Sequence, residues 1–184
     1  SPFLFIIKSS TVLQIHRNIE QLPHFDKAVV TIGAFDGVHN GHKTIIRQLK
    51  SEALSTGGET VIITFHPHPR KIVGANHKIA LLNTLHEKIE LLAKEGIDHL
   101  VIVPFDETFA ELSAESYIRN FLVKKIHPHT IIIGYDHHFG KDRAGNYLML
   151  EEFGKELGFA VKEIPRKLLN EITISSTQIR KALS

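Results

Sequence analysis

The sequence predicts an α/β fold, a doubly wound parallel sheet with helices on both faces. Short runs rich in β-branched residues alternate with amphipathic helical patterns five times along the chain. The runs that we interpret as buried strands are residues 28–33, 60–65, 100–103, 130–133 and 159–164. In such sheets, ligands bind beyond the carboxyl ends of the strands, near the reversal of strand order. Each motif described below follows such a strand end, which predicts one composite site there.

The first residues precede the sheet proper. Residues 1–26 carry scattered apolar side chains without a clear period, and we expect them to cover the sheet, with one edge strand near residues 12–15. The first buried strand leads into a helix over residues 43–53, which ends at Gly57. The apolar face of that helix consists of Ile45, Ile46, Leu49 and Ala53.

Two helices are expected in the middle of the chain from their capping residues. Thr84 and Glu87 have the spacing of a capping box, which predicts a helix over residues 85–95. Ser113 is a suitable N-cap for a second helix that runs to about Lys125.

The last third of the chain begins with a long loop. Residues 134–146 begin at a glycine, contain Gly140 and Gly145, and are expected to move as a lid. A helix over residues 147–157 and a strand follow, and the final helix is expected to begin at Ser175 or Ser176.

Composition narrows the class of protein. A chain of 184 residues with 42% hydrophobic and 23% charged residues suits a single domain, residues 1–184. A net charge of +2 gives no basic stripe for nucleic acid. The chain has no cysteine, and its longest early apolar run, residues 3–7, is too short for a signal peptide or a membrane span. We expect a cytoplasmic protein that binds neither nucleic acid nor membrane.

The stretch at residues 33–42, G-A-F-D-G-V-H-N-G-H, joins the first buried strand to its helix. Gly37 and Gly41 permit a tight turn and a close approach of an anion. Free amides at the helix start, with the positive end of the helix dipole, favour a phosphate. His39 and His42 are three residues apart and share one face of the first turn. Together these features predict a nucleotide site.

This stretch resembles the signature of the HxGH nucleotidylyltransferases. Three further stretches, at residues 64–69, 134–140 and 174–180, occur in the same order as in one branch of that superfamily. The chain therefore resembles the FMN adenylyltransferase (FAD synthetase) domain of bacterial bifunctional riboflavin kinase/FAD synthetases. The resemblance implies a Rossmann-like fold of the nucleotidylyltransferase type, in which AMP passes from ATP to FMN to give FAD and pyrophosphate.

The resemblance also assigns the ATP side of the site. It implies that His39, His42 and Arg180 are catalytic, with the histidines donating to the α-phosphate and the arginine holding phosphates. The residues that it implies for ATP binding are Gly33, Phe35, Gly37, His39, Gly41, His42, Ser176, Thr177 and Arg180.

On the flavin side, the resemblance implies contacts from Phe65, Pro67, His68, Pro69, Asp136 and Phe139. Mg²⁺ is expected with ATP, and Asp136 is its candidate ligand. The chain departs from the family pattern twice. His66 stands where members often have an acidic residue, and His137 stands where they usually have Phe.

Other interpretations remain open at this point. The chain is also compatible with a pantetheine-phosphate adenylyltransferase, with a cytidylyltransferase, or with a non-catalytic flavin or nucleotide sensor. The histidine pairs at residues 66–68, 127–129 and 137–138 make a zinc or nickel site conceivable. The family usually carries a following riboflavin kinase domain, which we expect in the full-length protein. No kinase activity is expected from this chain.

Overall fold

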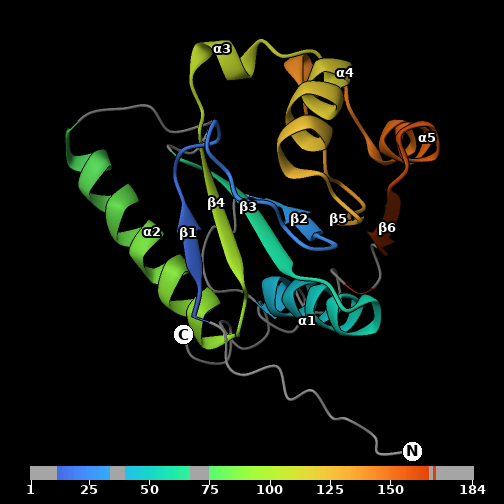
Figure 1. Ribbon diagram of the computed structural model, residues 1–184. Helices are drawn as coiled ribbons and strands as arrows, with labels where there is room; N and C mark the ends of the chain where they lie inside the picture. The colour runs from blue at the N-terminus through green and yellow to red at the C-terminus, as the bar shows by residue number, and fades with distance from the viewer. Residues whose placement is uncertain (1–11, 34–39, 67–74, 166–167, 169–184) are drawn as a thin grey trace, which may run out of the picture.

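A computed structural model describes residues 12–33, 40–66, 75–165 and 168, with backbone alone at 40–42 and 75–84 (Figure 1). Six strands form one parallel sheet in the order β1-β4-β3-β2-β5-β6. The strands are β1 (Gln14–His16), β2 (Val29–Ile32), β3 (Thr60–His66), β4 (His99–Pro104), β5 (Thr130–Gly134) and β6 (Ala160–Ile164). The order reverses beside β2, so the predicted doubly wound parallel sheet is confirmed.

Because the strands are parallel, the segments between them cross from the carboxyl end of one strand to the amino end of the next, and most of these segments contain helices. They are α1 (Asn40–Thr56), α2 (Ala75–Lys94), α3 (Glu107–Ala110), α4 (Ala114–Ser116), its π-helical continuation η1 (Tyr117–Ile126), the 3₁₀ turn η2 (Lys141–Arg143) and α5 (Tyr147–Leu157). Over the described part of the chain, no helix has the length and apolar content that crossing a membrane requires.

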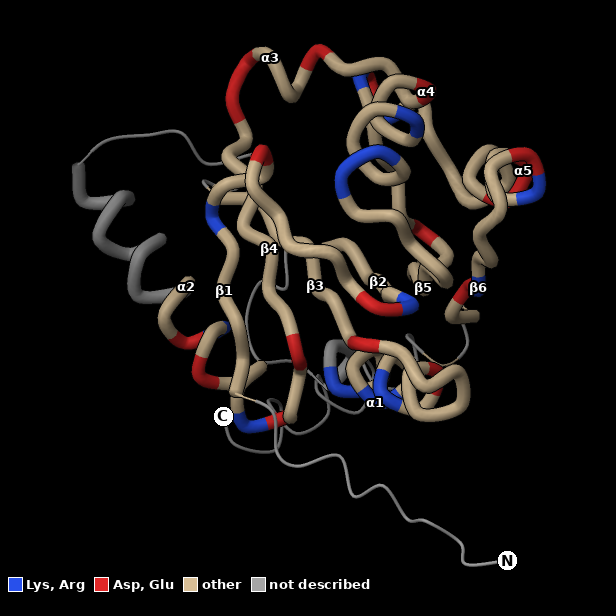
Figure 2. Tube along the Cα trace, viewed as in Figure 1, with Lys and Arg blue, Asp and Glu red and all other residues tan. Residues whose placement is uncertain are grey.

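Two apolar cores lie on opposite faces of the sheet because strand side chains alternate. On β2, Val29 belongs to one core and Val30 to the other. The first core packs under α1 and α2 through residues such as Leu49 and Leu92. The second packs under η1 and α5 through residues such as Phe121. The strands from β2 to β5 carry no charged residue, and Lys and Arg alternate with acidic residues around the outside (Figure 2).

Most predicted elements are confirmed. β1 is an edge strand, and α5 has its predicted bounds. Ser113 caps α4, since its side chain accepts a hydrogen bond from the amide of Ser116. The π-helical turns that follow were not predicted, because nothing in the apolar spacing of a helix marks i→i+5 hydrogen bonding.

The predicted capping box at Thr84 is wrong. α2 begins at Ala75, so Thr84 lies within the helix. The sequence reason is visible upstream, since Ile79 and Leu82 continue the spacing of the apolar residues Leu85, Ile89 and Leu92. The T-x-x-E pattern also occurs inside helices, and the longer apolar period is the stronger signal.

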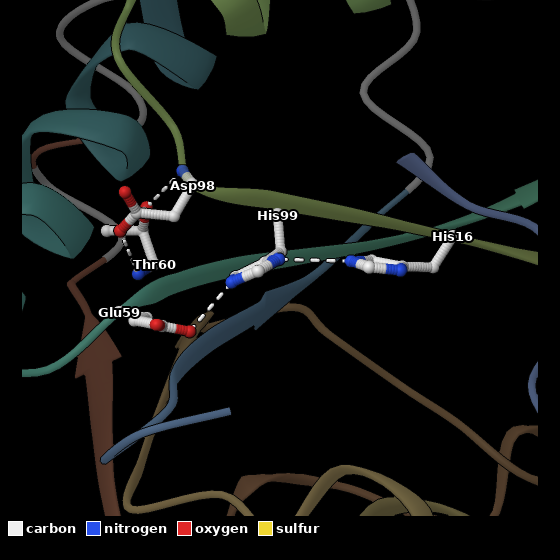
Figure 3. Close-up of polar contacts among 5 residues, drawn as sticks. All are labelled: His16, Glu59, Thr60, Asp98 and His99. Carbon is white, nitrogen blue, oxygen red and sulfur yellow. Dashed lines mark hydrogen bonds and ion pairs between the residues drawn. The ribbon is translucent and has the colours of Figure 1, made fainter. Parts of the chain in front are cut away.

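A buried polar network joins the amino ends of β3 and β4 (Figure 3). The carboxylate of Asp98 accepts from the Thr60 amide at 2.9 Å and from the Thr60 hydroxyl at 3.2 Å. The same hydroxyl oxygen accepts from the Asp98 amide at 2.8 Å. Since Asp98 is only 6% exposed, these bonds satisfy a carboxylate that burial would otherwise penalise.

A second, separate chain of hydrogen bonds lies beside this network and leads from Glu59 through two imidazoles to the edge strand. His99 Nε2 lies 2.7 Å from the Glu59 carboxylate, and His99 Nδ1 lies 3.0 Å from His16 Nε2. The ring of Phe25 packs edge-on against both imidazoles. With His99 Nε2–H donating to Glu59, His99 Nδ1 is free to accept from His16. This chain links β1 to β4 beyond their short backbone ladder.

Lowering the pH should destabilise the folded protein through His16 at this edge of the sheet. Burial, and then the nearby His99, lower the pKa of His16 from its usual 6.5. The unfolded chain therefore binds this proton more readily, and stability decreases as the pH falls below about 6.5. Thermal unfolding should occur at a lower temperature at pH 5.5 than at pH 7.5. His16→Gln should reduce this dependence and the exposed control His24→Gln should not; equal slopes for all three proteins would contradict the assignment.

Candidate functional site

The two strands that flank the reversal of strand order, β2 and β5, each have a glycine at the carboxyl end, Gly33 after β2 and Gly134 at the end of β5. Thr31 of β2 is opposite Ile132 of β5, so Gly33 and Gly134 lie at the same level, two residues further along. The amide of Gly33 donates to the carbonyl of Ile63 at 3.0 Å, and β3 continues for three residues beyond Ile63. The glycines therefore leave backbone accessible at the position where parallel α/β sheets bind ligands.

α1 begins close to this edge in sequence. Asn40 is its first residue, so the helix begins three residues before the predicted start at residue 43, and Gly41 and His42 lie in its first turn. The helix has 17 residues and no acidic residue in its first turn. Its first amides lack partners within the helix, and its dipole adds positive potential there, a combination that favours an anion. Of the other residues predicted for this motif, Phe35, Gly37 and His39 lie outside the described residues.

Six aromatic side chains form a continuous cluster beyond the ends of β3 and β4. This aromatic cluster consists of Phe65, Phe105, Phe109, Tyr117, Phe121 and Phe139. Phe109 of α3 lies at its centre, with ring centroids 5.5 Å from Phe65 and 5.9 Å from Tyr117. Tyr117 stacks in turn on Phe139 at 5.0 Å. The cluster thus connects Phe65 and Phe139, two residues that sequence analysis assigned separately to the flavin side.

The middle of the loop after β5 is held in place by packing and by backbone hydrogen bonds. Phe139 is 6% exposed and exchanges two backbone hydrogen bonds with Gly145. Lys141 N donates to the Leu112 carbonyl at 2.7 Å, and Gly140 takes a φ of 77° close against Ala114. These contacts hold Phe139 in the aromatic cluster. Movement of the loop as a lid stays a prediction.

Three polar residues of this loop differ in their surroundings. Asp136 is exposed. His138 Nδ1 lies 3.2 Å from the Gly145 carbonyl, to which it donates. His137 stacks on Phe139 at 6.0 Å, and its Nε2 atom is buried. Burial lowers the pKa of His137 to about 4 against the opposing effect of Asp136, so the imidazole is neutral at physiological pH.

At the end of β3, His66 lies among positive charges. Partial burial, followed by Lys88 and then Arg17, lowers the pKa of His66 below its usual value. Lys88 comes from α2, and Arg17 follows β1. Two cations therefore lie near His66, which favours an anionic group at this position. Sequence analysis did not predict that Lys88 and Arg17 lie near His66.

Several predicted site residues lie outside the described residues. They are Pro67, His68, Pro69, Ser176, Thr177 and Arg180, besides the three of the glycine-rich motif. Among the described residues, no three His, Cys, Asp or Glu side chains group closely enough to hold a metal ion.

Sequence reasoning assigned no role to Phe105, Phe109, Tyr117 and Phe121. A signal was present only for Tyr117 and Phe121, which have the four-residue spacing of one helix face.

The doubly wound parallel sheet and the glycine-rich strand-to-helix connection define an α/β protein of the nucleotide-binding class. A family model described as FAD synthetase matches residues 22–178. The bifunctional riboflavin kinase/FMN adenylyltransferase of Escherichia coli K12 is 35% identical over 167 residues, 91% of this chain and 53% of the relative. That of Haemophilus influenzae is 38% identical over 155 residues, 84% and 50% respectively. The chain belongs to the FAD synthetase family.

The chain spans about half the length of the curated relatives that it matches. Among solved structures, it resembles one described as a macrolide-efflux protein from Streptococcus pneumoniae, with a TM-score of 0.67 and 23% identity. The alignment covers 84% of this chain and 50% of the other. At this identity the likeness supports the fold alone.

Gly145→Ala should displace Phe139. A Cβ at Gly145 would lie 2.3 Å from the Phe139 ring, so the ring or the loop must move. We expect a loss of about 1–3 kcal/mol in the free energy of unfolding, as for other overpacked sites. Chemical denaturation measures this loss. Adding Phe139→Leu should recover part of it, and equal stability of wild type and Gly145→Ala would contradict the packing described.

Proposed function

We propose that this chain is an FMN adenylyltransferase, which transfers AMP from ATP to FMN and releases FAD and pyrophosphate. Membership of the FAD synthetase family supports this proposal. The structural observation that carries it is the partly exposed side of the aromatic cluster, formed by Phe65, Phe105 and Phe109 at the carboxyl edge of the sheet. Aromatic side chains at that edge suit a planar, apolar ring system such as the flavin.

The reaction requires positioning and charge stabilisation. An oxygen of the FMN phosphate attacks the α-phosphorus of ATP, and the bond to the bridging oxygen breaks as pyrophosphate leaves. Charge accumulates on the phosphate oxygens, so fixed N–H donors and cations lower the barrier. The first turn of α1 offers such amides, and His42 belongs to that turn. We assign His39 and His42 to the α-phosphate, and Ser176, Thr177 and Arg180 to the phosphates of ATP.

Gly33 and Gly41 have a steric role in this proposal. Gly33 lies at the switch point beside β5, and Gly41 lies in the first turn of α1. Because neither has a Cβ, a phosphate can approach the backbone closely there and reach the free amides of the first turn of α1. Phe35 and Gly37 complete the ATP side, and Pro67, His68 and Pro69 the flavin side, as the resemblance implies.

Mg²⁺ enters this proposal as part of the substrate MgATP. It binds mainly to phosphates, with one or two carboxylates and water. The exposed carboxylate of Asp136, in the loop after β5, fits the role of a single protein ligand. Within the described residues no larger acidic group competes for that role. When bound, the ion neutralises charge on the phosphates.

The direct test is chromatography of products after the chain is mixed with ATP, Mg²⁺ and FMN, with riboflavin in a parallel reaction. We expect FAD and pyrophosphate from FMN, and none when Mg²⁺ is chelated. The riboflavin reaction measures any kinase activity separately. A folded protein that binds ATP and yields no FAD would refute the proposal, and conversion of pantetheine phosphate or CTP instead would assign another branch of the superfamily.

His42→Ala should nearly abolish turnover without unfolding the protein. Loss of one donor to the developing charge typically lowers kcat by about 10²–10³-fold. Single-turnover FAD formation measures the chemical step, and circular dichroism checks the fold. The matched control is His86→Ala, which removes an exposed imidazole from α2 and should leave turnover unchanged. Normal turnover in His42→Ala would remove this histidine from the mechanism.

A further inference from the structure

Three nitrogen-bearing side chains from three different segments lie together where β3 ends. His66 is the last residue of β3, Lys88 belongs to α2, and Arg17 follows β1. Besides partial burial, the positive charges of Lys88 and Arg17 lower the pKa of His66. Together the three residues form a basic cluster at the carboxyl edge of the sheet.

The register of the sheet places Arg17 on the same side as His66, independently of any effect of charge. If the pairing of β1 with β4 is continued by one residue, Arg17 is level with Ile102, which pairs with Thr64 of β3. His66 follows Thr64 by two residues and has the same orientation. Ile102 belongs to the core under α1 and α2, and Leu13, in the same alternation as Arg17, packs against that core. The basic cluster therefore lies on the α2 side of the sheet.

The beginning of α1 lies on this same side of the sheet. α1 packs on the core through Ile46 and Leu49, as α2 does through Leu85 and Leu92. β2, which leads to α1, pairs directly with β3, and neighbouring strands are about 4.8 Å apart. The first turn of α1 and the basic cluster thus provide two positions for anionic groups at one edge and on one side of the sheet.

The end of β3 carries a different chemistry on its other side. Phe65 precedes His66 and points to the opposite face, where it packs against the core under η1. With Phe105 and Phe109 it forms the partly exposed side of the aromatic cluster. A ligand with an aromatic ring at one end and a phosphate at the other matches both sides of this strand end. FMN has this form, with a flexible ribityl chain between ring and phosphate.

Arg17 is the member of the basic cluster that is best suited to bind a ligand. Its side chain is exposed, and its guanidinium forms no hydrogen bond or ion pair with another residue that the structure describes. A guanidinium can donate two parallel hydrogen bonds to one phosphate group. The segment before β2, which sequence analysis expected only to cover the sheet, therefore brings a cation to the functional edge.

We infer that Arg17 binds the phosphate group of FMN, with Lys88 adding positive potential, and thereby places the attacking oxygen next to the ATP phosphate at the first turn of α1. This inference rests on the proposed function for the nature of the ligand. Arg17 is a residue that determines which acceptor is bound, because riboflavin has the same ring as FMN and no phosphate.

The experiment compares the binding of FMN and of riboflavin to the whole chain, measured by flavin fluorescence. Arg17→Gln should weaken FMN binding about tenfold or more, as expected for the loss of a hydrogen bond to a charged group, and should leave riboflavin binding unchanged. Arg17→Lys keeps the charge and should recover part of the affinity for FMN. Binding of α,β-methylene-ATP, measured by calorimetry, should be the same in all three proteins.

Arg47→Gln is the matched control for a general effect of charge. Arg47 is also exposed, and it lies about two turns along α1 from the first residue of that helix, away from the basic cluster. This variant loses the same charge by the same substitution and should bind FMN as wild type does. Circular dichroism checks that each variant is folded.

The outcomes separate this inference from the proposed function. An unchanged ratio of FMN to riboflavin affinity in Arg17→Gln would refute the role of Arg17, as would an equal effect of Arg47→Gln. Weaker binding of the ATP analogue, with FMN binding intact, would assign the basic cluster to the phosphates of ATP and refute the inference in that way. Wild type that binds FMN and forms no FAD would refute the proposed function alone, since the binding ratio still tests Arg17.

Discussion

The parallel pairing of β2 with β3 on one side and β5 on the other determines the rest of this structure. Parallel strands require crossover connections, and these place helices on both faces and all carboxyl ends at one edge. Val29 and Val30 show the consequence on adjacent residues, since each belongs to a different core. The switch point at β2 is therefore a result of topology, and the glycines that follow β2 and β5 coincide with it.

At that edge, the aromatic cluster and the electropositive surroundings of His66 are distinct in chemistry. The cluster extends from the end of β3 through α3 and η1 to the loop after β5, and its rings pack at centroid distances from 5.0 to 5.9 Å. His66, by contrast, lies near Lys88 and Arg17. The described part of this edge thus offers an apolar aromatic surface and, apart from it, a position close to two cations.

Sequence analysis predicted correctly those elements that depend on neighbouring residues of the chain. Strand runs, the Ser113 cap and the bounds of α5 follow from side-chain period and capping chemistry, and the structure has them. The start of α2 was mistaken because a capping pattern was preferred to a longer apolar period. Phe105 and Phe109 were missed for another reason: their contact with Phe65 depends on the pairing of β3 with β4, and no local pattern encodes that distance.

The two ends of the sheet differ in how completely their polar groups are satisfied. At the amino end, Asp98 and Thr60 bond reciprocally, and His99 uses both ring nitrogens. At the carboxyl end, His137 keeps a buried nitrogen without a partner. Full pairing stabilises one end at no functional cost, because ligands of parallel sheets do not bind there. An unpaired group at the other end costs stability in the folded protein, because its lost hydration is not replaced by a hydrogen bond.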